Sequence, residues 1–147
     1  MEAILRSLRR TRKNRVVGGA RIMVGLVIVM TGVMKFSVPM LREAWSGQLI
    51  QADIPFPTFN FWVVPAIEIG VGSAWAFGLF SRVGALVVFG VMVVAAYVHL
   101  TVGDPGLFPL QPHEPIIPLV IMALTLLVMW RGGAWSADLR AGAKIEV

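Results

Sequence analysis

Apolar residues gather in four long runs along the chain, and these runs set the predicted elements. They cover residues 16–36, 59–80, 83–102 and 115–130. Each is close to the length of about 20 apolar residues that an α-helix needs to cross the roughly 30 Å hydrocarbon core of a bilayer. The fourth run is the shortest, and Pro115 and Pro118 suit the first turn of its helix. The pattern therefore predicts four membrane-spanning helices.

The connections between the runs differ in kind. The first carries apolar side chains at helical spacing and then a proline turn, namely Val38, Leu41, Trp45 and Leu49, followed by Pro55 and Pro57. This pattern predicts a short helix that lies flat on the outer surface of the membrane. A hairpin is expected around Ser81-Arg82, and residues 103–114 predict a loop rich in proline and glycine. We therefore expect an all-α integral membrane four-helix bundle with a short interfacial helix after the first span.

Composition narrows the class of protein. Of the 147 residues, 57% are hydrophobic and only 14% are charged, against about 25% charged residues in typical soluble domains. We expect one four-span membrane domain at residues 16–131, a basic cytoplasmic tail at 1–15 and a second cytoplasmic tail at 132–147. The absence of cysteine excludes disulfides, thiol redox chemistry and thiolate metal sites.

Basic residues lie mostly on one side of the predicted spans. Six of the 13 precede the first span, namely Arg6, Arg9, Arg10, Arg12, Lys13 and Arg15. They are expected to contact anionic lipid headgroups or a partner subunit, and their position in one tail argues against nucleic acid as a partner. No small-residue cleavage site follows, so the first span is expected to remain as a signal anchor. Because basic residues resist translocation, the asymmetry predicts cytoplasmic N- and C-termini.

The first predicted span has one face that combines glycines and cations, namely Gly18, Arg21, Gly25, Gly32 and Lys35. Small residues let a neighbouring helix approach closely, so we interpret the glycines as a helix-packing face. In the simplest interpretation, the two cations extend to opposite membrane interfaces. The alternative for Lys35 is that it turns inward to meet Glu68.

Glu68 is the most informative residue of the second span. It lies some 14 Å from the start of the span at about 1.5 Å per residue, and so near the middle of the membrane. A carboxylate at this depth cannot face lipid. Either it fixes the helix register as a protonated or hydrogen-bonded group, or it binds a ligand or handles protons.

Two further residues complete a candidate polar pocket in the outer half of the bundle. His99 lies near the outer end of the third span and Glu114 precedes the fourth, so Lys35, Glu68, His99 and Glu114 form the candidate ligand-binding set. A lone histidine is more often a satisfied core residue than a ligand. Neither His99 nor His113 has the spacing of a metal or haem motif, and no set of catalytic residues is evident.

Four short motifs give the chain a resemblance to a known family. They are Gly-x-x-Lys-Phe at 32–36, Pro-x-x-Glu-x-Gly-x-Gly at 65–72, Gly-Leu-Phe-Ser-Arg at 78–82 and Gly-Ala-Trp-Ser-x-Asp at 133–138. In this order and spacing the chain resembles the DoxX family of small four-helix bacterial membrane proteins. It departs from the usual Gly-Pro-Gly near the end by having Gly132-Gly133-Ala134.

The resemblance implies a component of the bacterial cytoplasmic (inner) membrane that is associated with redox systems. Relatives serve as the small subunit of a thiosulfate:quinone oxidoreductase or act with antioxidant and sulfur-transfer proteins, and distant relatives act as assembly chaperones. Among the candidate polar residues, the resemblance to the family extends to Lys35 and Glu68.

Three functions remain open at this stage. The leading hypothesis is a non-catalytic accessory subunit of a larger redox or energy-transducing membrane complex, with a homo-oligomer as the other expected assembly. The second is a quinone-linked oxidoreductase component, in which Lys35, Glu68 and His99 bind the quinone head. The third is a small-molecule carrier or membrane chaperone. No intrinsic cofactor is expected, and a quinone or a lipid is the candidate ligand.

Overall fold

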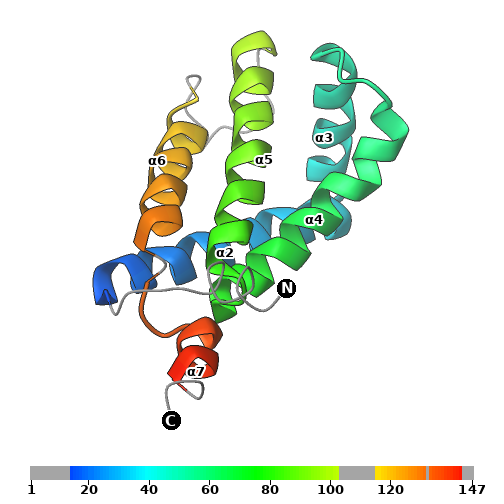
Figure 1. The fold of residues 1–147 in the computed structure, drawn as a ribbon. Coiled ribbons are helices and arrows are strands. Elements are labelled where there is room, and N and C mark those ends of the chain that lie inside the picture. The colour runs from blue at the N-terminus through cyan, green and yellow to red at the C-terminus, as the bar shows by residue number, and fades with distance from the viewer. Residues whose placement is uncertain (1–13, 103–114, 132, 144–147) are drawn as a thin grey trace.

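The computed structural model describes residues 14–102, 115–131 and 133–143, which form helices joined by short turns (Figure 1). The helices are α2 (Arg15–Ser37), α3 (Pro39–Gln51), α4 (Pro57–Phe77), α5 (Ser81–Thr101), α6 (Ile116–Arg131) and α7 (Ala137–Ala143). The described residues contain no β-strand, which confirms the predicted all-α class for this part of the chain. The four predicted spans correspond to α2, α4, α5 and α6.

A cap and a proline set the two ends of α2. Asn14 begins the helix, because its side-chain oxygen accepts a hydrogen bond from the Val17 amide at 3.0 Å. Pro39 ends it, because the residue before a proline avoids the helical conformation, and Val38 is extended with φ −103° and ψ 111°. Pro39 then occupies the first turn of α3, where a missing amide proton costs little.

Gly78 ends α4 and reverses the chain into α5. It adopts a φ of +71°, a left-handed conformation that favours glycine. The Leu79 amide donates to the Ala74 carbonyl at 2.8 Å, and the Gly78 amide donates to the Trp75 carbonyl at 3.0 Å. This pattern is a Schellman motif, which satisfies carbonyls left free at a helix C-terminus. The short turn leaves α4 and α5 as antiparallel neighbours (Figure 1).

Glycines bring α2 and α4 into close antiparallel contact. A Cβ built on Gly25 would lie 2.8 Å from the carbonyl oxygen of Gly72. Two turns further along α2, a Cβ on Gly32 would lie 2.9 Å from the carbonyl oxygen of Pro65. Gly18 meets the backbone of the segment after α6 in the same way. The three glycines of the predicted packing face therefore lie at contacts inside this chain.

The main core lies where α2, α4, α5 and α6 meet. Trp75 is fully buried there, and its indole N–H donates to the Ser81 carbonyl at 2.8 Å. Gly84 of α5 lies against the indole, since a Cβ built on it would be 3.0 Å from Trp75 Cδ1. The other buried core residues are Val17, Val24, Ile28, Ala85, Val88, Met92, Ile121 and Val128.

Among the described helices, α2 and α5 are long and apolar enough to cross a membrane, judged by length and composition. Helix α6 is apolar but shorter, with 16 residues. The outer faces of these helices carry exposed apolar side chains such as Met23, Leu86 and Leu126. Two of the four predicted spans thus meet the requirements for a membrane helix, and the four-span bundle stays a prediction.

Helix α3 differs from the flat interfacial helix that its sequence predicts. Figure 1 shows it rising beside α5 instead of lying across the end of the bundle. It buries Ala44, Trp45 and Leu49 and contacts α2, α4 and α5. An apolar stripe at helical spacing suits a membrane surface and a helix–helix contact equally. The pattern therefore finds the helix but not its direction.

The segment after α6 folds back onto the bundle. The Ala134 amide donates to the Asn14 carbonyl at 2.9 Å, and the Asp138 amide donates to the Gly78 carbonyl at 3.1 Å. Ser136 then begins α7, because its hydroxyl oxygen accepts a hydrogen bond from the Leu139 amide at 3.2 Å. Residues 133–138, which belong to the predicted C-terminal tail at 132–147, are therefore packed against the bundle.

Candidate functional site

Lys35 of α2 and Glu68 of α4 form an ion pair inside the bundle. The Lys35 ammonium donates to both carboxylate oxygens of Glu68, at 2.6 and 2.8 Å. Glu68 is 5% exposed and Lys35 is 20% exposed. An unpaired charge at such a position would carry a large desolvation penalty, so each group depends on the other. The structure therefore has Lys35 turned inward, as the alternative interpretation of that residue predicts.

Pro65 accounts for the aromatic ring beside this pair. Because proline has no N–H, α4 cannot offer the Phe61 carbonyl its usual partner four residues later. The indole N–H of Trp45 donates to that carbonyl at 3.3 Å. Lys35 Nζ lies 4.4 Å from the centre of the Trp45 ring, a cation–π contact. A proline in α4 thus helps to position a ring of α3 over a cation of α2.

Further aromatic contacts join the end of α2 to the start of α4. The rings of Phe36 and Trp62 stack with centroids 5.8 Å apart, and Phe61 meets Trp62 edge-on at 5.0 Å. Phe36 follows Lys35 directly in the chain. These contacts hold the helix end that carries the lysine close to α4.

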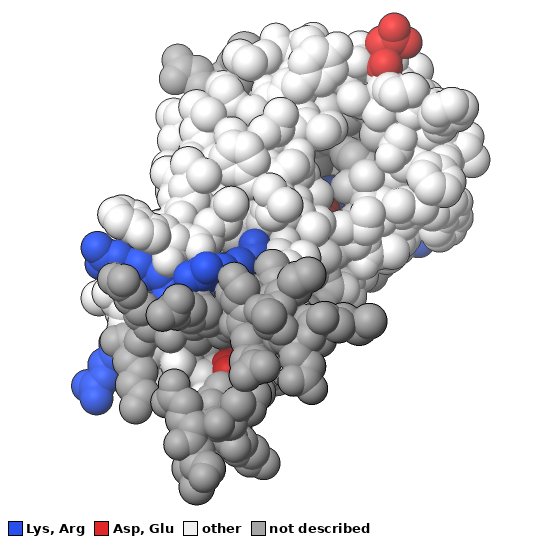
Figure 2. All heavy atoms as spheres, viewed as in Figure 1, with Lys and Arg blue, Asp and Glu red and all other residues white. Residues whose placement is uncertain are grey.

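An apolar crevice adjoins Glu68 between α4 and α5. Among the described residues that line it, Glu68 alone is ionisable, and the others are Ile28, Ile67, Val71, Val87, Val88, Val91 and Met92. Figure 2 shows a hollow in the surface of the molecule, with acidic and basic atoms visible at its bottom. The crevice has a volume of about 10 Å³, about the space of one water molecule, and its exposed lining is apolar.

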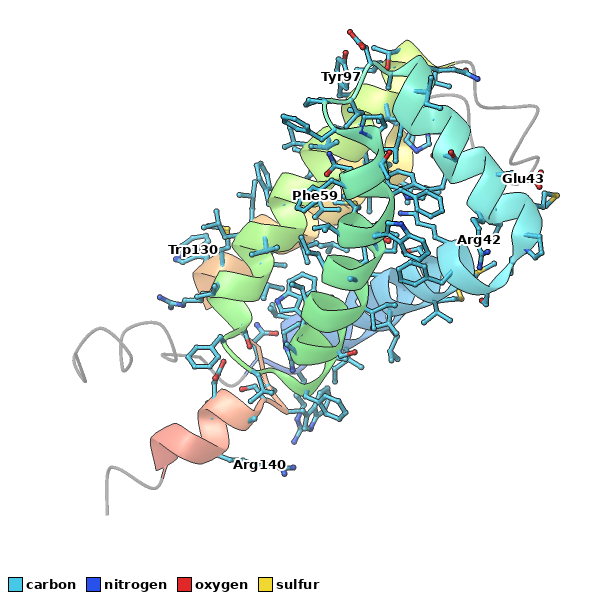
Figure 3. The ribbon with its side chains drawn as sticks, turned by 90° about the vertical axis from the view of Figure 1, so that its right-hand side faces the viewer. Arg42, Glu43, Phe59, Tyr97, Trp130 and Arg140 are labelled. Carbon is cyan, nitrogen blue, oxygen red and sulfur yellow. The ribbon has the colours of Figure 1, made fainter. Side chains whose placement is uncertain are left out.

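A small second core lies at the far end of α5. The Tyr97 hydroxyl donates to the Ala52 carbonyl at 3.3 Å, and Ala52 packs with Val98, Val102 and Ile54. Figure 3 shows Tyr97 at this end of the molecule. The turn between α3 and α4 therefore reaches α5 beyond the crevice.

Of the four residues of the predicted pocket, the structure shows Lys35 and Glu68 in contact. His99 is half-buried and lies two helical turns beyond Met92 of the crevice, or about 10 Å along α5. Glu114 and the tail cations Arg9, Arg10, Arg12 and Lys13 lie outside the described residues. Arg15 is described, and it is exposed at the start of α2. The ligand-binding role of Lys35, Glu68, His99 and Glu114 stays a prediction.

Arg21 forms a second polar cluster, near the start of α2. Its side chain is fully buried, so the prediction that it extends to the interface is wrong. Nη1 donates to the carbonyls of Trp75 and Ala76, and Nη2 donates to those of Ala134 and Trp135 at 3.2 and 3.1 Å. The first two carbonyls end α4, where the helix dipole favours a cation. Arg21 thus joins three separate parts of the chain.

Asp138 caps α5 from a different helix. Its carboxylate accepts hydrogen bonds from the Phe80 and Ser81 amides at 3.0 and 2.9 Å, and from the Ser81 hydroxyl at 3.2 Å. It is 2% exposed. Asp138 ends one of the four motifs, at residues 133–138, but its sequence context indicates no role for it. Spacing along the chain could not show that this motif meets the one at residues 78–82.

The chemistry available at Lys35 and Glu68 is charge and hydrogen bonding. Within residues 14–102, 115–131 and 133–143, no three His, Asp or Glu side chains gather to hold a metal ion. The pair can hold the polar head of a ligand, with the lysine as donor and the carboxylate as acceptor.

Fold and site together define a small all-α protein with apolar helices of membrane-spanning length and an internal ion pair between two helices. The sequence model of the DoxX family matches residues 17–101, which include Lys35 and Glu68. The chain therefore belongs to the DoxX family. No match was found among curated proteins or among solved structures.

Proposed function

We propose that the protein is a non-catalytic accessory subunit of a larger redox or energy-transducing membrane complex. Its membership of the DoxX family supports a small membrane protein with a link to quinone or redox systems. The distribution of basic residues favours an orientation in the bacterial cytoplasmic membrane with both termini cytoplasmic. The protein would contribute helices to the complex, and its partners would supply the redox centres.

The internal polar contacts support a structural role. Lys35 and Glu68 satisfy each other between α2 and α4. Arg21 joins α2 to α4 and the C-terminal segment, and Asp138 joins α7 to α5. Each of these charged groups holds two elements of this chain together, as expected for a rigid scaffold.

An open surface of small residues on the outer face of α4 supports the proposal most directly. Ala66 and Gly70 are both exposed and lie one turn apart. A Cβ added to Gly70 would meet no atom within 4 Å, so nothing described in this chain occupies that space. Ile67 and Phe77 expose apolar side chains on the same helix. Small residues four apart allow a partner helix to approach closely within a membrane.

Extraction from native membranes in a gentle detergent tests this proposal. We expect the wild-type chain to purify with a fixed set of larger membrane proteins at constant stoichiometry. Gly70→Leu should lose these proteins, because its side chain would occupy the space that a partner helix needs. Gly90→Leu is the matched control, since Gly90 is exposed on α5 and a Cβ there would also meet nothing within 4 Å. Recovery of the wild-type chain alone, or as a homo-oligomer, would overturn the proposal.

A second candidate function is the binding of a quinone head at Lys35 and Glu68. The ion pair favours it, because Lys35 can donate a hydrogen bond to a carbonyl of the head and Glu68 can accept one from a hydroxyl of its reduced form. A carboxylic acid in contact with the quinone can also give up a proton to a quinone oxygen as the quinone is reduced. Reaction of the quinone would still need an electron-donating partner.

Quinone content distinguishes the two candidates. Extracted protein should carry about one quinone per chain if this site binds the head, and Glu68→Gln should lose it while remaining folded. Lipid extracts without quinone from wild-type protein would exclude this second function. That result would leave the accessory role in place.

A further inference from the structure

Two arginines and a tryptophan meet where α6 ends and α5 begins. Arg82 Nη2 donates to the carbonyl oxygen of Trp130 at 3.4 Å. The Arg131 guanidinium lies 5.5 Å from the centre of the Trp130 ring. That ring is 71% exposed, and Figure 3 shows it pointing outward from the bundle. One tryptophan thus holds two guanidinium groups on adjacent helix ends.

No described carboxylate neutralises these two arginines. The one described ion pair of the chain joins Lys35 to Glu68. The nearby Asp138 is committed to the amides of Phe80 and Ser81. Figure 2 shows basic side chains gathered in a band across this end of the molecule. The cluster of Arg82, Trp130 and Arg131 therefore keeps a positive charge that can attract an anion.

An apolar surface continues from this cluster along α5 and α6. The two helices are antiparallel neighbours (Figure 1). Since Arg82 lies opposite Trp130, Leu86 and Leu126 lie one turn deeper on their respective helices. Leu86 is 59% exposed and Leu126 is 53% exposed. A ligand that fits both features has an anionic head and a long apolar tail.

We propose that the cluster of Arg82, Trp130 and Arg131 binds the phosphate of an anionic phospholipid, whose acyl chain lies over Leu86 and Leu126. Guanidinium groups match phosphate oxygens with two parallel hydrogen bonds. The indole ring suits the boundary between headgroup and acyl chain. The site is separate from Lys35 and Glu68 and does not depend on the accessory or quinone function.

Lipid retention tests the proposal. The full chain is reconstituted in vesicles with equal amounts of phosphatidylglycerol and phosphatidylcholine, extracted gently, and its bound lipids are counted by native mass spectrometry. We expect the wild-type protein to retain phosphatidylglycerol preferentially. Each of Arg82→Gln and Arg131→Gln should reduce that preference about fivefold, as expected for one cation at a membrane surface. Arg42→Gln is the matched control, because Arg42 is exposed on α3, on the other side of the molecule (Figure 3).

Two further results keep the test decisive. Arg131→Gln breaks no side-chain hydrogen bond of the described chain, so it remains informative if Arg82→Gln is unstable. Inorganic phosphate at millimolar concentration should not displace the lipid, because it has no tail to contact α5 and α6. An unchanged lipid preference in Arg131→Gln, an equal loss in Arg42→Gln, or full displacement by phosphate would each overturn the proposal.

Discussion

At the scale of single residues, a series of contacts that begins at Pro65 positions the ion pair. The missing amide of Pro65 frees the Phe61 carbonyl, which accepts the Trp45 indole, whose ring lies under the Lys35 ammonium. Glu68 completes the set with two hydrogen bonds. The ion pair is therefore positioned by three helices.

Because the two charges are paired, the effects of substituting them on the free energy of unfolding should be strongly non-additive. Lys35→Met or Glu68→Leu alone leaves a buried charge without its partner and should reduce the free energy of unfolding by about 3–5 kcal/mol. The double variant Lys35→Met/Glu68→Leu removes both charges and should be more stable than either single variant. Thermal unfolding in one detergent measures all four proteins. If the two losses simply add in the double variant, the charges are not coupled as described.

Arg21 and Asp138 show where residue-level prediction from sequence stops. Their partners are backbone groups that lie more than 50 positions away along the chain. Backbone carbonyls and amides have no sequence signature, so nothing in the pattern around Arg21 distinguishes an interface cation from a buried one. The contact between Lys35 and Glu68 can be predicted from sequence as one of two alternatives, because opposite charges within apolar runs require partners.

At the scale of elements, glycines occur both at contacts between helices and on the outer surface. Gly25 and Gly72 lie where α2 and α4 meet, and an added Cβ at either would lie 2.8 Å from the backbone of the other helix. Gly70 and Gly90 are exposed, with no atom within 4 Å of such a Cβ. The same residue type therefore has opposite consequences at these two kinds of position.

Alanine substitutions should make this difference measurable. Gly25→Ala forces α2 and α4 apart and should destabilise the protein by about 1–3 kcal/mol, the usual cost of overpacking. Gly70→Ala adds no contact within the chain and should be neutral or stabilising by up to about 1 kcal/mol, because alanine favours a helix over glycine. Melting temperatures of the two variants give the comparison. Equal destabilisation would mean that α2 and α4 do not approach as closely as described.

Element boundaries were largely predictable, and element directions were not. Apolar runs and the prolines at 39 and 57 locate α2 to α6 within a few residues, because they act locally. The direction of α3 depends on which helices its apolar face meets, and that is a property of the whole fold. The packing of residues 133–138 against the bundle likewise depends on contacts with distant parts of the chain, so the sequence does not predict it.

At the scale of the whole molecule, the C-terminal segment closes one end of the bundle. It receives hydrogen bonds from Arg21 through the carbonyls of Ala134 and Trp135, and Asp138 caps α5. Residues near the two ends of the described chain are thereby joined to the turn between α4 and α5.

Removal of this cap should destabilise the bundle without touching the ion pair. Asp138→Ala leaves the Phe80 and Ser81 amides without their acceptor and should reduce stability by about 1–2 kcal/mol, in the range for loss of a helix cap. Asp138→Asn retains an acceptor oxygen and should lose less. Hydrogen exchange of the amides at the start of α5 provides the readout. Unchanged protection there in Asp138→Ala would contradict the capping role.

Cysteine crosslinking in native membranes shows whether the outer face of α4 contacts another membrane protein. Because the chain has no cysteine, a single cysteine at Gly70 reports on that position alone, and one at Gly90 serves as the control. With a short thiol-to-amine crosslinker in native membranes, we predict that Gly70→Cys forms one defined adduct with a larger, different polypeptide and that Gly90→Cys does not. The absence of any adduct at position 70, or adducts only between copies of this chain, would contradict the proposed accessory role.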